Sequence, residues 1–299
     1  MFIHRGALCH QRWQLLILLT LALLLSIGTQ RGAAFLLPVS PRIVALGGST
    51  TAVAGTGMGE TMTQNPAGLA QSDTGIQFFR SNQFAFADYE LTGLSFSWKT
   101  GAFGFGVYYG QDGAALLEKR HGEEIKNFFG ETQYSVGIGR EIKKDFNVGI
   151  NLWQNLKSID ILEDAGLSGK RKCLGLDLGC LWSTKKWGLG LSINSLALSG
   201  DMETAPSQFK LGLRLGEVEK LAVFSDLIVA QDAFGDYALR YHGGVEAKFL
   251  PNLAIRLGFD DTRSVAVGLG VAKSHLKFDY AYRVHEAGST HYLSTGYQF

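Results

Sequence analysis

The sequence lacks an excess of charge of either sign. Its 28 Lys and Arg side chains nearly balance 27 Asp and Glu side chains, and the formal net charge is +1. No basic stripe stands out, so the composition argues against nucleic acid as a partner. Charged residues make up 18% of the chain and Pro only 5 residues, whereas Gly contributes 38 residues. This composition is typical neither of a disordered chain nor of an ordinary soluble enzyme.

The chain also lacks an apolar run long enough to cross a bilayer comfortably as a helix. The run LLILLTLALLLSI at 15–27 has 13 residues, whereas a spanning helix needs about 20. A basic start precedes this run and small residues follow it, which is the pattern of an export signal. We expect a signal peptide at 1–34, cleaved after Ala34 or alternatively after Gly28. A retained membrane anchor is the competing interpretation.

Motifs of catalysis and metal binding are missing too. There is no complete G-x-S-x-G elbow, HGEE at 121–124 lacks a second histidine, and the glycine-rich stretch near 47–59 lacks the P-loop lysine. Cys173 and Cys180 have opposite parity on one predicted strand, and about 3.3 Å per residue puts them beyond disulfide reach. We therefore expect no catalytic residue, no metal and no cofactor. A hydrolase that uses a Ser and a His of a membrane-embedded wall is the enzymatic alternative.

Period-two alternation is what the sequence has in abundance. The stretch FGFGVYY at 103–109 places large apolar residues on one face and mostly glycines on the other, and LGLDLGCLW at 174–182 repeats the pattern. No convincing amphipathic helix lies between such stretches, so the body is all-β. We expect fourteen strands, at 75–83, 89–98, 102–110, 131–140, 146–156, 172–182, 187–194, 208–215, 221–229, 238–249, 253–260, 264–272, 276–283 and 291–299.

The lengths of the connections distinguish a soluble sandwich from a membrane barrel. Turns after even-numbered strands are all short, whereas long connections, at 111–130, 157–171 and 195–207, follow odd-numbered strands. Outer-membrane barrels sort their loops in this way, and a sandwich has no reason to. Trp182 and Trp187 flank one short turn on the apolar face, as in an interfacial girdle. The sequence therefore predicts an all-β transmembrane antiparallel β-barrel of about 14 strands at 75–299, in contact with the lipid of the bacterial outer membrane.

Charged residues alternate with glycines on the face that a barrel turns inward. The expected lumen charges are Arg214, Arg240, Glu246, Arg256, Asp260, Asp279 and Arg283. An ion-pair network that holds a plug is the favoured interpretation. Pore-lining groups that tune passage and a simple solvated lumen surface are the alternatives.

The chain ends HYLSTGYQF, with Tyr297 and the terminal Phe299 on one face. A last strand that ends in Phe, with Tyr two residues before it, resembles the signal that the barrel-assembly machinery recognises. The resemblance implies that this machinery is a partner.

A compact segment of small residues precedes the strands. In TQNPAGLAQ, Asn65 is suited to cap a helical turn and Pro66 to be its first residue. The run RIVALGGSTTAVAGTGMGETMTQNPAGLAQ at 42–71 resembles the N-terminal segment of the FadL-like superfamily of outer-membrane barrels, most closely its PorV/PorQ-type branch. The matching residues are Gly47, Gly48, Ala52, Val53, Ala54, Asn65, Pro66, Ala67, Gly68 and Leu69. Gly55-Thr56 and Gln64 depart from that pattern.

The resemblance implies that residues 35–74 form a hatch inside a fourteen-stranded barrel; a plain periplasmic extension is the alternative. It also implies passive transport of hydrophobic small molecules, with the connections 111–130 and 157–171 collecting the ligand. The alternative function is an outer-membrane interaction or shuttle component that holds a secreted protein.

Overall fold

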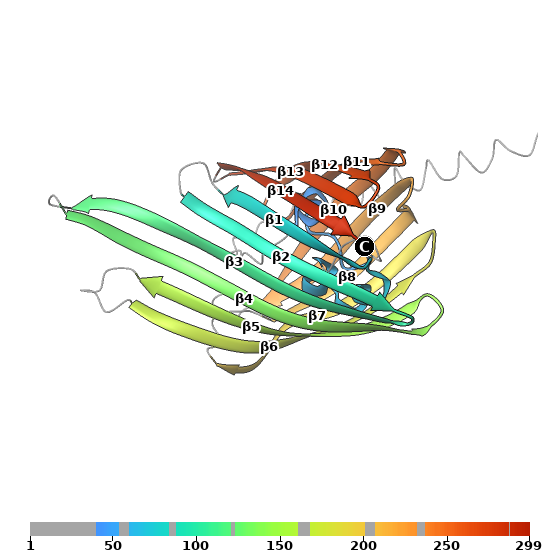
Figure 1. Cartoon of the computed structure of the whole chain (residues 1–299), viewed down its shortest axis with the longest axis horizontal. Helices are drawn as coiled ribbons and strands as arrows, with labels where there is room; N and C mark the ends of the chain where they lie inside the picture. Colours follow the sequence, from blue (N-terminus) through green and yellow to red (C-terminus); the bar gives the residue numbers. More distant parts are fainter. Residues whose placement is uncertain are drawn as a thin grey trace, which may run out of the picture.

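Fourteen strands close into one antiparallel β-barrel in the computed structural model, which describes residues 40–53, 60–83, 88–120, 123–160, 168–200, 207–231, 237–286 and 288–299 (Figure 1). Each strand pairs with the next along the chain, and β1 pairs with β14 to close the barrel. The strands are β1 Gly75–Gln83, β2 Asp88–Thr100, β3 Phe103–Arg120, β4 Glu123–Lys143, β5 Phe146–Asp160, β6 Ser168–Ser183, β7 Trp187–Gly200, β8 Gln208–Glu217, β9 Leu221–Gln231, β10 Tyr237–Leu250, β11 Leu253–Asp260, β12 Val265–Lys273, β13 Leu276–His285 and β14 Gly288–Gln298. The predicted all-β barrel and its number of strands are confirmed.

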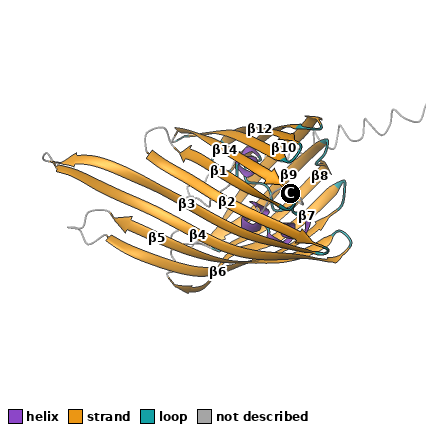
Figure 2. Ribbon diagram, in the orientation of Figure 1, coloured by secondary structure: helices purple, strands orange, loops and turns teal. Residues whose placement is uncertain are grey.

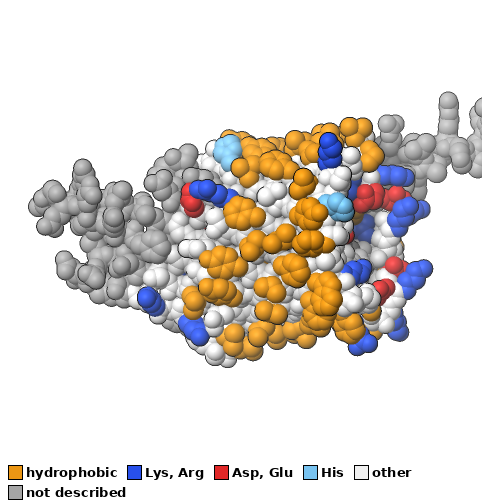
Figure 3. All heavy atoms as spheres, viewed as in Figure 1, with side chains coloured by type: hydrophobic (Ala, Val, Ile, Leu, Met, Phe, Trp, Pro, Cys, Tyr) orange, Lys and Arg blue, Asp and Glu red, His pale blue; other side chains and the backbone are white. Residues whose placement is uncertain are grey.

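Alternation along the strands separates an apolar outer wall from a small or polar lumen. In β12, Val265, Val267 and Leu269 are exposed, whereas Ala266 between them is buried. Figure 3 shows the resulting hydrophobic band on one face of the barrel, with Lys, Arg, Asp and Glu gathered at the end where the short turns lie. A sheet closed on itself has no free edge and leaves this apolar face for lipid.

Three short helical segments precede the barrel strands and lie inside the barrel (Figure 2). They are α2 Pro41–Ala45, η1 Glu60–Thr63 and η2 Pro66–Gln71. Among the described residues, no helix has the length and apolar character needed to cross a membrane.

The two ends of the barrel differ, but not in the way predicted. The prediction of a long connection at 111–130 is wrong, because β3 continues to Arg120 and β4 begins at Glu123. Likewise β5 runs to Asp160 and β7 to Gly200. Figure 1 shows β3–β6 reaching beyond the neighbouring strands. Pairing continues there without the lipid-facing alternation that marks a membrane strand in sequence, so the pattern gave no signal. The apolar stretch IDILEDAGL lies mostly outside the described residues.

Aromatic residues mark the opposite end, as predicted. The rings of Trp182 and Trp187 lie 5.2 Å apart on the outer wall, beside the short turn between β6 and β7.

The two cysteines of β6 differ in their environment. Cys173 is buried and Cys180 is only partly buried, which agrees with their opposite parity.

Candidate functional site: a hatch in the lumen

The segment before β1 fills the middle of the barrel. We call its described residues, 40–53 and 60–74, the hatch. Every residue at 40–53 except Gly48 is buried, and so is every residue at 61–70. The expected signal peptide at 1–34, together with 35–39 and 54–59 of the expected hatch segment, lies outside the described residues.

The box Asn65-Pro66-Ala67-Gly68-Leu69 starts a short helix. Asn65 is the N-cap of η2, where its side-chain Oδ1 accepts a hydrogen bond of 3.1 Å from the main-chain N–H of Ala67, and Pro66 is the first helical residue. Both positions are those that the sequence indicates. The amide Nδ2 of Asn65 donates to the main-chain oxygens of Thr51, at 2.8 Å, and of Cys180 in β6, at 3.0 Å. Asn65 therefore joins two parts of the hatch to the wall.

Glycines of the wall give this helix room to approach. A Cβ at Gly149 in β5 would overlap the main chain of Pro66 and Ala67, and a Cβ at Gly104 in β3 would overlap the carbonyl of Leu69. Further wall glycines approach main-chain or side-chain atoms of the hatch closely, namely Gly106, Gly137, Gly139, Gly179, Gly188, Gly190, Gly212, Gly244, Gly258 and Gly268. The hatch therefore packs against the glycines that alternate with apolar residues in the sequence, around most of the circumference of the barrel.

The Gly47-Gly48 pair packs against the opposite wall. Gly47 has φ +65° and Gly48 has φ +81°, a backbone region that favours glycine. A side chain at Gly47 would also strike the main chain of Gly243 and Phe259, in β10 and β11. The pair thus serves as a turn that passes close to the wall.

A buried carboxylate holds the turn that follows. The Oδ2 atom of Asp226 in β9 accepts hydrogen bonds from the main-chain N–H groups of Thr50 and Thr51, both at 3.0 Å, and from the Thr51 hydroxyl at 2.6 Å. Nearby, the ammonium of Lys210 in β8 donates to Oε1 of Gln64 at 3.1 Å. Successive N–H groups that converge on one carboxylate form a strong, directional attachment.

A second attachment is an ion-pair chain that begins in the hatch. The Oε2 atom of Glu246 in β10 lies 3.0 Å from Nε of Arg42 and 2.6 Å from Nε of Arg256. The Nη1 atom of Arg256 lies 2.6 Å from Oδ1 of Asp279 in β13. Three of the predicted lumen charges thus meet each other and a hatch residue. Because Glu246 is 1% exposed and lies between two arginines, removal of its carboxylate would leave the buried guanidinium of Arg42 without this counter-ion.

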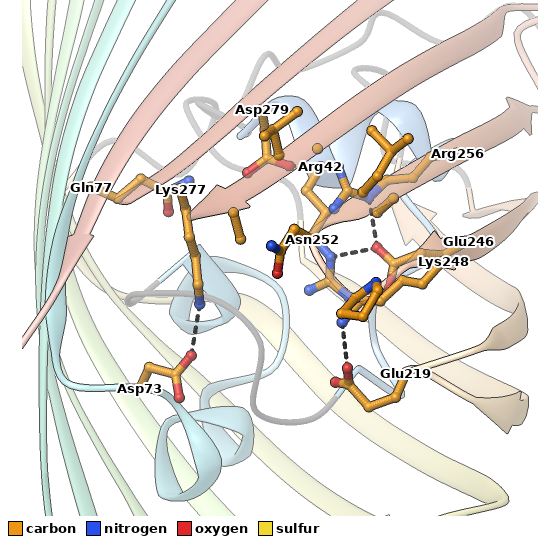
Figure 4. A pocket seen from close by; sticks show the side chains of 16 residues that line it. Arg42, Asp73, Gln77, Glu219, Glu246, Lys248, Asn252, Arg256, Lys277 and Asp279 are labelled. Atoms are coloured by element: carbon orange, nitrogen blue, oxygen red, sulfur yellow. Dashed lines mark hydrogen bonds and ion pairs between the residues drawn. The ribbon is translucent and has the colours of Figure 1, made fainter. Parts of the chain in front are cut away.

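The ion pairs of Arg42, Glu246 and Arg256 border a cavity at the short-turn end of the barrel (Figure 4). The volume of this cavity is about 310 Å³. At the opposite side of the cavity, Nζ of Lys277 in β13 lies 2.8 Å from Oδ2 of Asp73, just before β1. Arg42 lies near the start of the described hatch and Asp73 at its end. Both ends of the hatch are therefore ion-paired to the wall around one cavity.

The remaining predicted lumen charges do not take part in these ion pairs. Arg283 pairs with Asp260 at 2.5 Å, and Arg240 lies 3.9 Å from Asp261. Arg214 donates to main-chain oxygens instead, including those of Thr184 and Gly216, both at 2.6 Å. Arg214 thereby closes the turns next to β7 and β8.

The sequence reasoning missed Arg42, Asp73 and Asp261. For Arg42 a signal existed, because it is an isolated charge in a segment of small and apolar residues. Asp73 and Asp261 sit at strand ends, where a charge is ordinarily a solvated group and gives no signal.

The hatch also has an apolar side. Met62 and Leu69 of the hatch form a buried cluster with Phe79 of β1, Leu91 of β2 and Tyr108 of β3. The rings of Phe79 and Tyr108 are stacked with their centroids 6.1 Å apart. The wall behind this part of the hatch is therefore aromatic and aliphatic. Two further apolar clusters join the hatch to β9 and to β12–β14, beside the ion pairs of that wall.

The C-terminal residues lie on the outer wall. Tyr297 is 43% exposed and Phe299 is 67% exposed, and their rings lie 5.4 Å apart. The main-chain N–H of Phe299 donates to the oxygen of Thr74 at 2.9 Å. Both rings are thus accessible at the short-turn end.

Among the described residues, no group of three or more His, Cys, Asp and Glu side chains is placed to hold a metal ion. Hydrogen bonds and ion pairs fix a small hatch against the wall.

No family model matches the chain, and no curated protein matches its sequence. Solved structures do resemble it. The toluene transporter TodX of P. putida is 12% identical with a TM-score of 0.66, and the match covers 87% of this chain and 98% of TodX. The toluene transporter TbuX of Ralstonia pickettii is 15% identical with a TM-score of 0.61, over 89% and 100% of the two chains. A FadL homologue of Pseudomonas aeruginosa is 11% identical with a TM-score of 0.59, over 89% and 100%. The chain therefore has the fourteen-stranded, FadL-like barrel fold of these three proteins.

Proposed function

We propose that this protein is a barrel of the bacterial outer membrane through which small hydrophobic molecules pass down their concentration gradient. The observation that carries the proposal is a hatch-filled lumen within the fold of TodX and TbuX, which are toluene transporters. The channel CymD, for monoaromatic hydrocarbons, has the same fold, with a TM-score of 0.61. A hatch buried against the wall suits selective passage better than a general aqueous pore.

The apolar cluster of the hatch supports a hydrophobic cargo. Met62 and Leu69 face Phe79, Leu91 and Tyr108 without an ion pair among them. An apolar molecule that displaces such contacts replaces them with similar ones. A polar solute on the same path would lose its hydrogen bonds to water and gain few in return.

The expected partners belong to this proposal as well. The exposed apolar outer wall requires lipid, and the exposed Tyr297 and Phe299 suit recognition by the barrel-assembly machinery. The PorV/PorQ-type interpretation, with a secreted protein as cargo, receives no support from the hydrocarbon transporters and channels among the structural neighbours. We therefore advance no second function.

Uptake by whole cells tests the proposal. Bacteria that lack barrels of this fold express the protein from a plasmid or carry the empty vector. Entry of radiolabelled toluene at low concentration is measured in both strains, and entry of arabinose is measured for comparison. We expect faster toluene entry with the protein, unchanged by a protonophore, and no change for arabinose. Toluene entry equal to that of vector cells, with the barrel assembled, would refute the proposal.

A further inference from the structure

A groove of about 430 Å³ runs across the outside of the barrel, over β4–β7. Its apolar lining includes Ile138, Val148, Ile150, Leu178, Leu191 and Ile193. Their alternation with buried residues places them on the outer wall, where Ile138 is 39% and Ile150 48% exposed. The volume is within the ~300–1,000 Å³ of ligand sites in general.

The groove lies directly behind the hatch. Gly149 and Gly179 line it with their main chains, and a Cβ on either would strike Pro66 or Asn65 on the lumen side. Cys180 belongs to both sides, because it lines the groove while its main-chain oxygen accepts the Asn65 amide. An occupant of the groove is thus separated from the hatch by one thickness of backbone.

The end of the groove toward the short turns is cationic. The guanidinium carbon of Arg140 lies 4.9 Å from the centre of the Phe103 ring, and both residues line the groove. Arg140 is exposed, and among the described residues no carboxylate pairs with it. Four exposed lysines lie at the two short turns of this end, namely Lys143, Lys144, Lys185 and Lys186. Lys185 lies 3.8 Å from Glu217 and its side chain is 78% exposed.

We propose that this groove binds one anionic glycerophospholipid of the periplasmic leaflet. One acyl chain lies along Ile138, Ile150 and Leu178, and the phosphate is bound by Arg140. Guanidinium groups recognise phosphate oxygens through paired N–H donors, and neighbouring cations strengthen binding of an anionic headgroup. Trp182 and Trp187 mark the same level of the wall as an interface. The inference rests on the proposed membrane location, with the short turns toward the periplasm, and not on the molecule transported.

Lipid binding to the purified barrel tests the inference. The full mature protein is delipidated in mild detergent, and native mass spectrometry counts bound lipid during titration with phosphatidylglycerol or phosphatidylcholine. We expect one phosphatidylglycerol to bind tightly and phosphatidylcholine to bind less tightly. Arg140→Gln should weaken binding of phosphatidylglycerol about tenfold, because it removes a charge-assisted hydrogen bond. Val148→Phe should weaken binding of both lipids because it fills the groove.

Two control variants lie on the opposite wall. Lys273→Gln removes an exposed cation at the same end of the barrel, and Leu269→Phe enlarges a residue of the outer wall that is 41% exposed. Both should bind phosphatidylglycerol as the parent protein does. Equal binding by the parent, Arg140→Gln and Val148→Phe would overturn the inference, since bound lipid would then be ordinary boundary lipid.

Cys180 provides a local readout. In a Cys173→Ala background, phosphatidylglycerol should slow the reaction of Cys180 with a small maleimide, and Arg140→Gln should abolish this protection. A rate that is the same with and without lipid would contradict the inference. Tight lipid binding by a barrel that does not admit toluene would refute the proposed function but not the lipid site. Toluene entry without selective lipid binding would refute only the lipid site.

Discussion

The side-chain amide of Asn65 in the hatch donates a hydrogen bond of 3.0 Å to the main-chain oxygen of Cys180 in β6. The same side chain bonds to the main chain of Thr51 and Ala67, so every partner is a backbone atom. Asn65 is 1% exposed, and no water can replace these bonds readily. A single amide, which has both donors and an acceptor, thus sets the position of the hatch relative to the wall.

Replacement of Asn65 and Pro66 by Ala should loosen the hatch. Three hydrogen bonds are lost, each with a net contribution of about 1 kcal/mol, and the start of η2 loses its fixed φ. We expect faster leakage of small polar solutes in liposome-swelling assays, with heat-modifiable mobility showing that the barrel is folded. Thr295→Ala, at an exposed residue of β14 on the outer wall, is the control. Unchanged permeability of an assembled double variant would show that this box does not close the barrel.

Gly149→Ala should displace the hatch although it adds one methyl group. The new Cβ would overlap the main chain of Pro66 and Ala67, which cannot rotate away as a side chain can. Overpacking of this kind costs about 1–3 kcal/mol, and we expect a lower free energy of unfolding together with solute leakage. Gly169→Ala is the control, because a Cβ there meets no atom within 4 Å. Equal free energies of unfolding of the two variants would mean that the hatch does not pack tightly against Gly149 in β5.

The sequence predicted the barrel well because alternation is a local property. Every expected strand is present, since a lipid-facing residue such as Val267 and a lumen-facing neighbour such as Ala266 differ in kind. The extensions of β3 to Arg120 and of β4 from Glu123 escaped prediction, because their sequence lacks the regular period-two alternation of the other strands. The cap at Asn65 was predictable from local chemistry as well.

The attachments of the hatch were less predictable. Glu246 and Arg256 were expected in the lumen, but their partner Arg42 lies 204 positions from Glu246, and no periodic pattern links the two. Such a contact depends on where the closed barrel places a strand relative to the hatch. A single sequence does not encode that relationship in any short window.

Glu246→Gln should destabilise the protein far more than a matched change at the rim of the same cavity. The substitution leaves the guanidinium groups of Arg42 and Arg256 without the buried carboxylate that lies between them. Such losses cost about 3–5 kcal/mol, measured as the free energy of unfolding in urea. Glu219→Gln removes a carboxylate that is 71% exposed in its side chain and should cost less than about 1 kcal/mol.

A double-variant cycle separates the ion pair from simple loss of packing. Arg42→Met should cost less in the Glu246→Gln background than alone, because its counter-ion is already gone. Additive effects of the two substitutions would argue that Arg42 and Glu246 stabilise the protein independently of each other.

Deletion of Phe299 should lower the yield of assembled barrel strongly, while the free energy of unfolding of the barrels that do form falls by no more than about 1 kcal/mol. The ring is 67% exposed on the outer wall and contacts Tyr297, so the folded barrel loses little packing and one terminal main-chain hydrogen bond to Thr74 without this residue. The assembly machinery, in contrast, would lose the terminal aromatic group that we propose it recognises. Heat-modifiable mobility of membrane fractions measures the yield, and urea unfolding of purified barrel measures the stability. Phe249→Ala, at an exposed aromatic residue near the end of β10, should leave both quantities unchanged. A normal yield after deletion of Phe299 would mean that this barrel is recognised through another feature of its last strand.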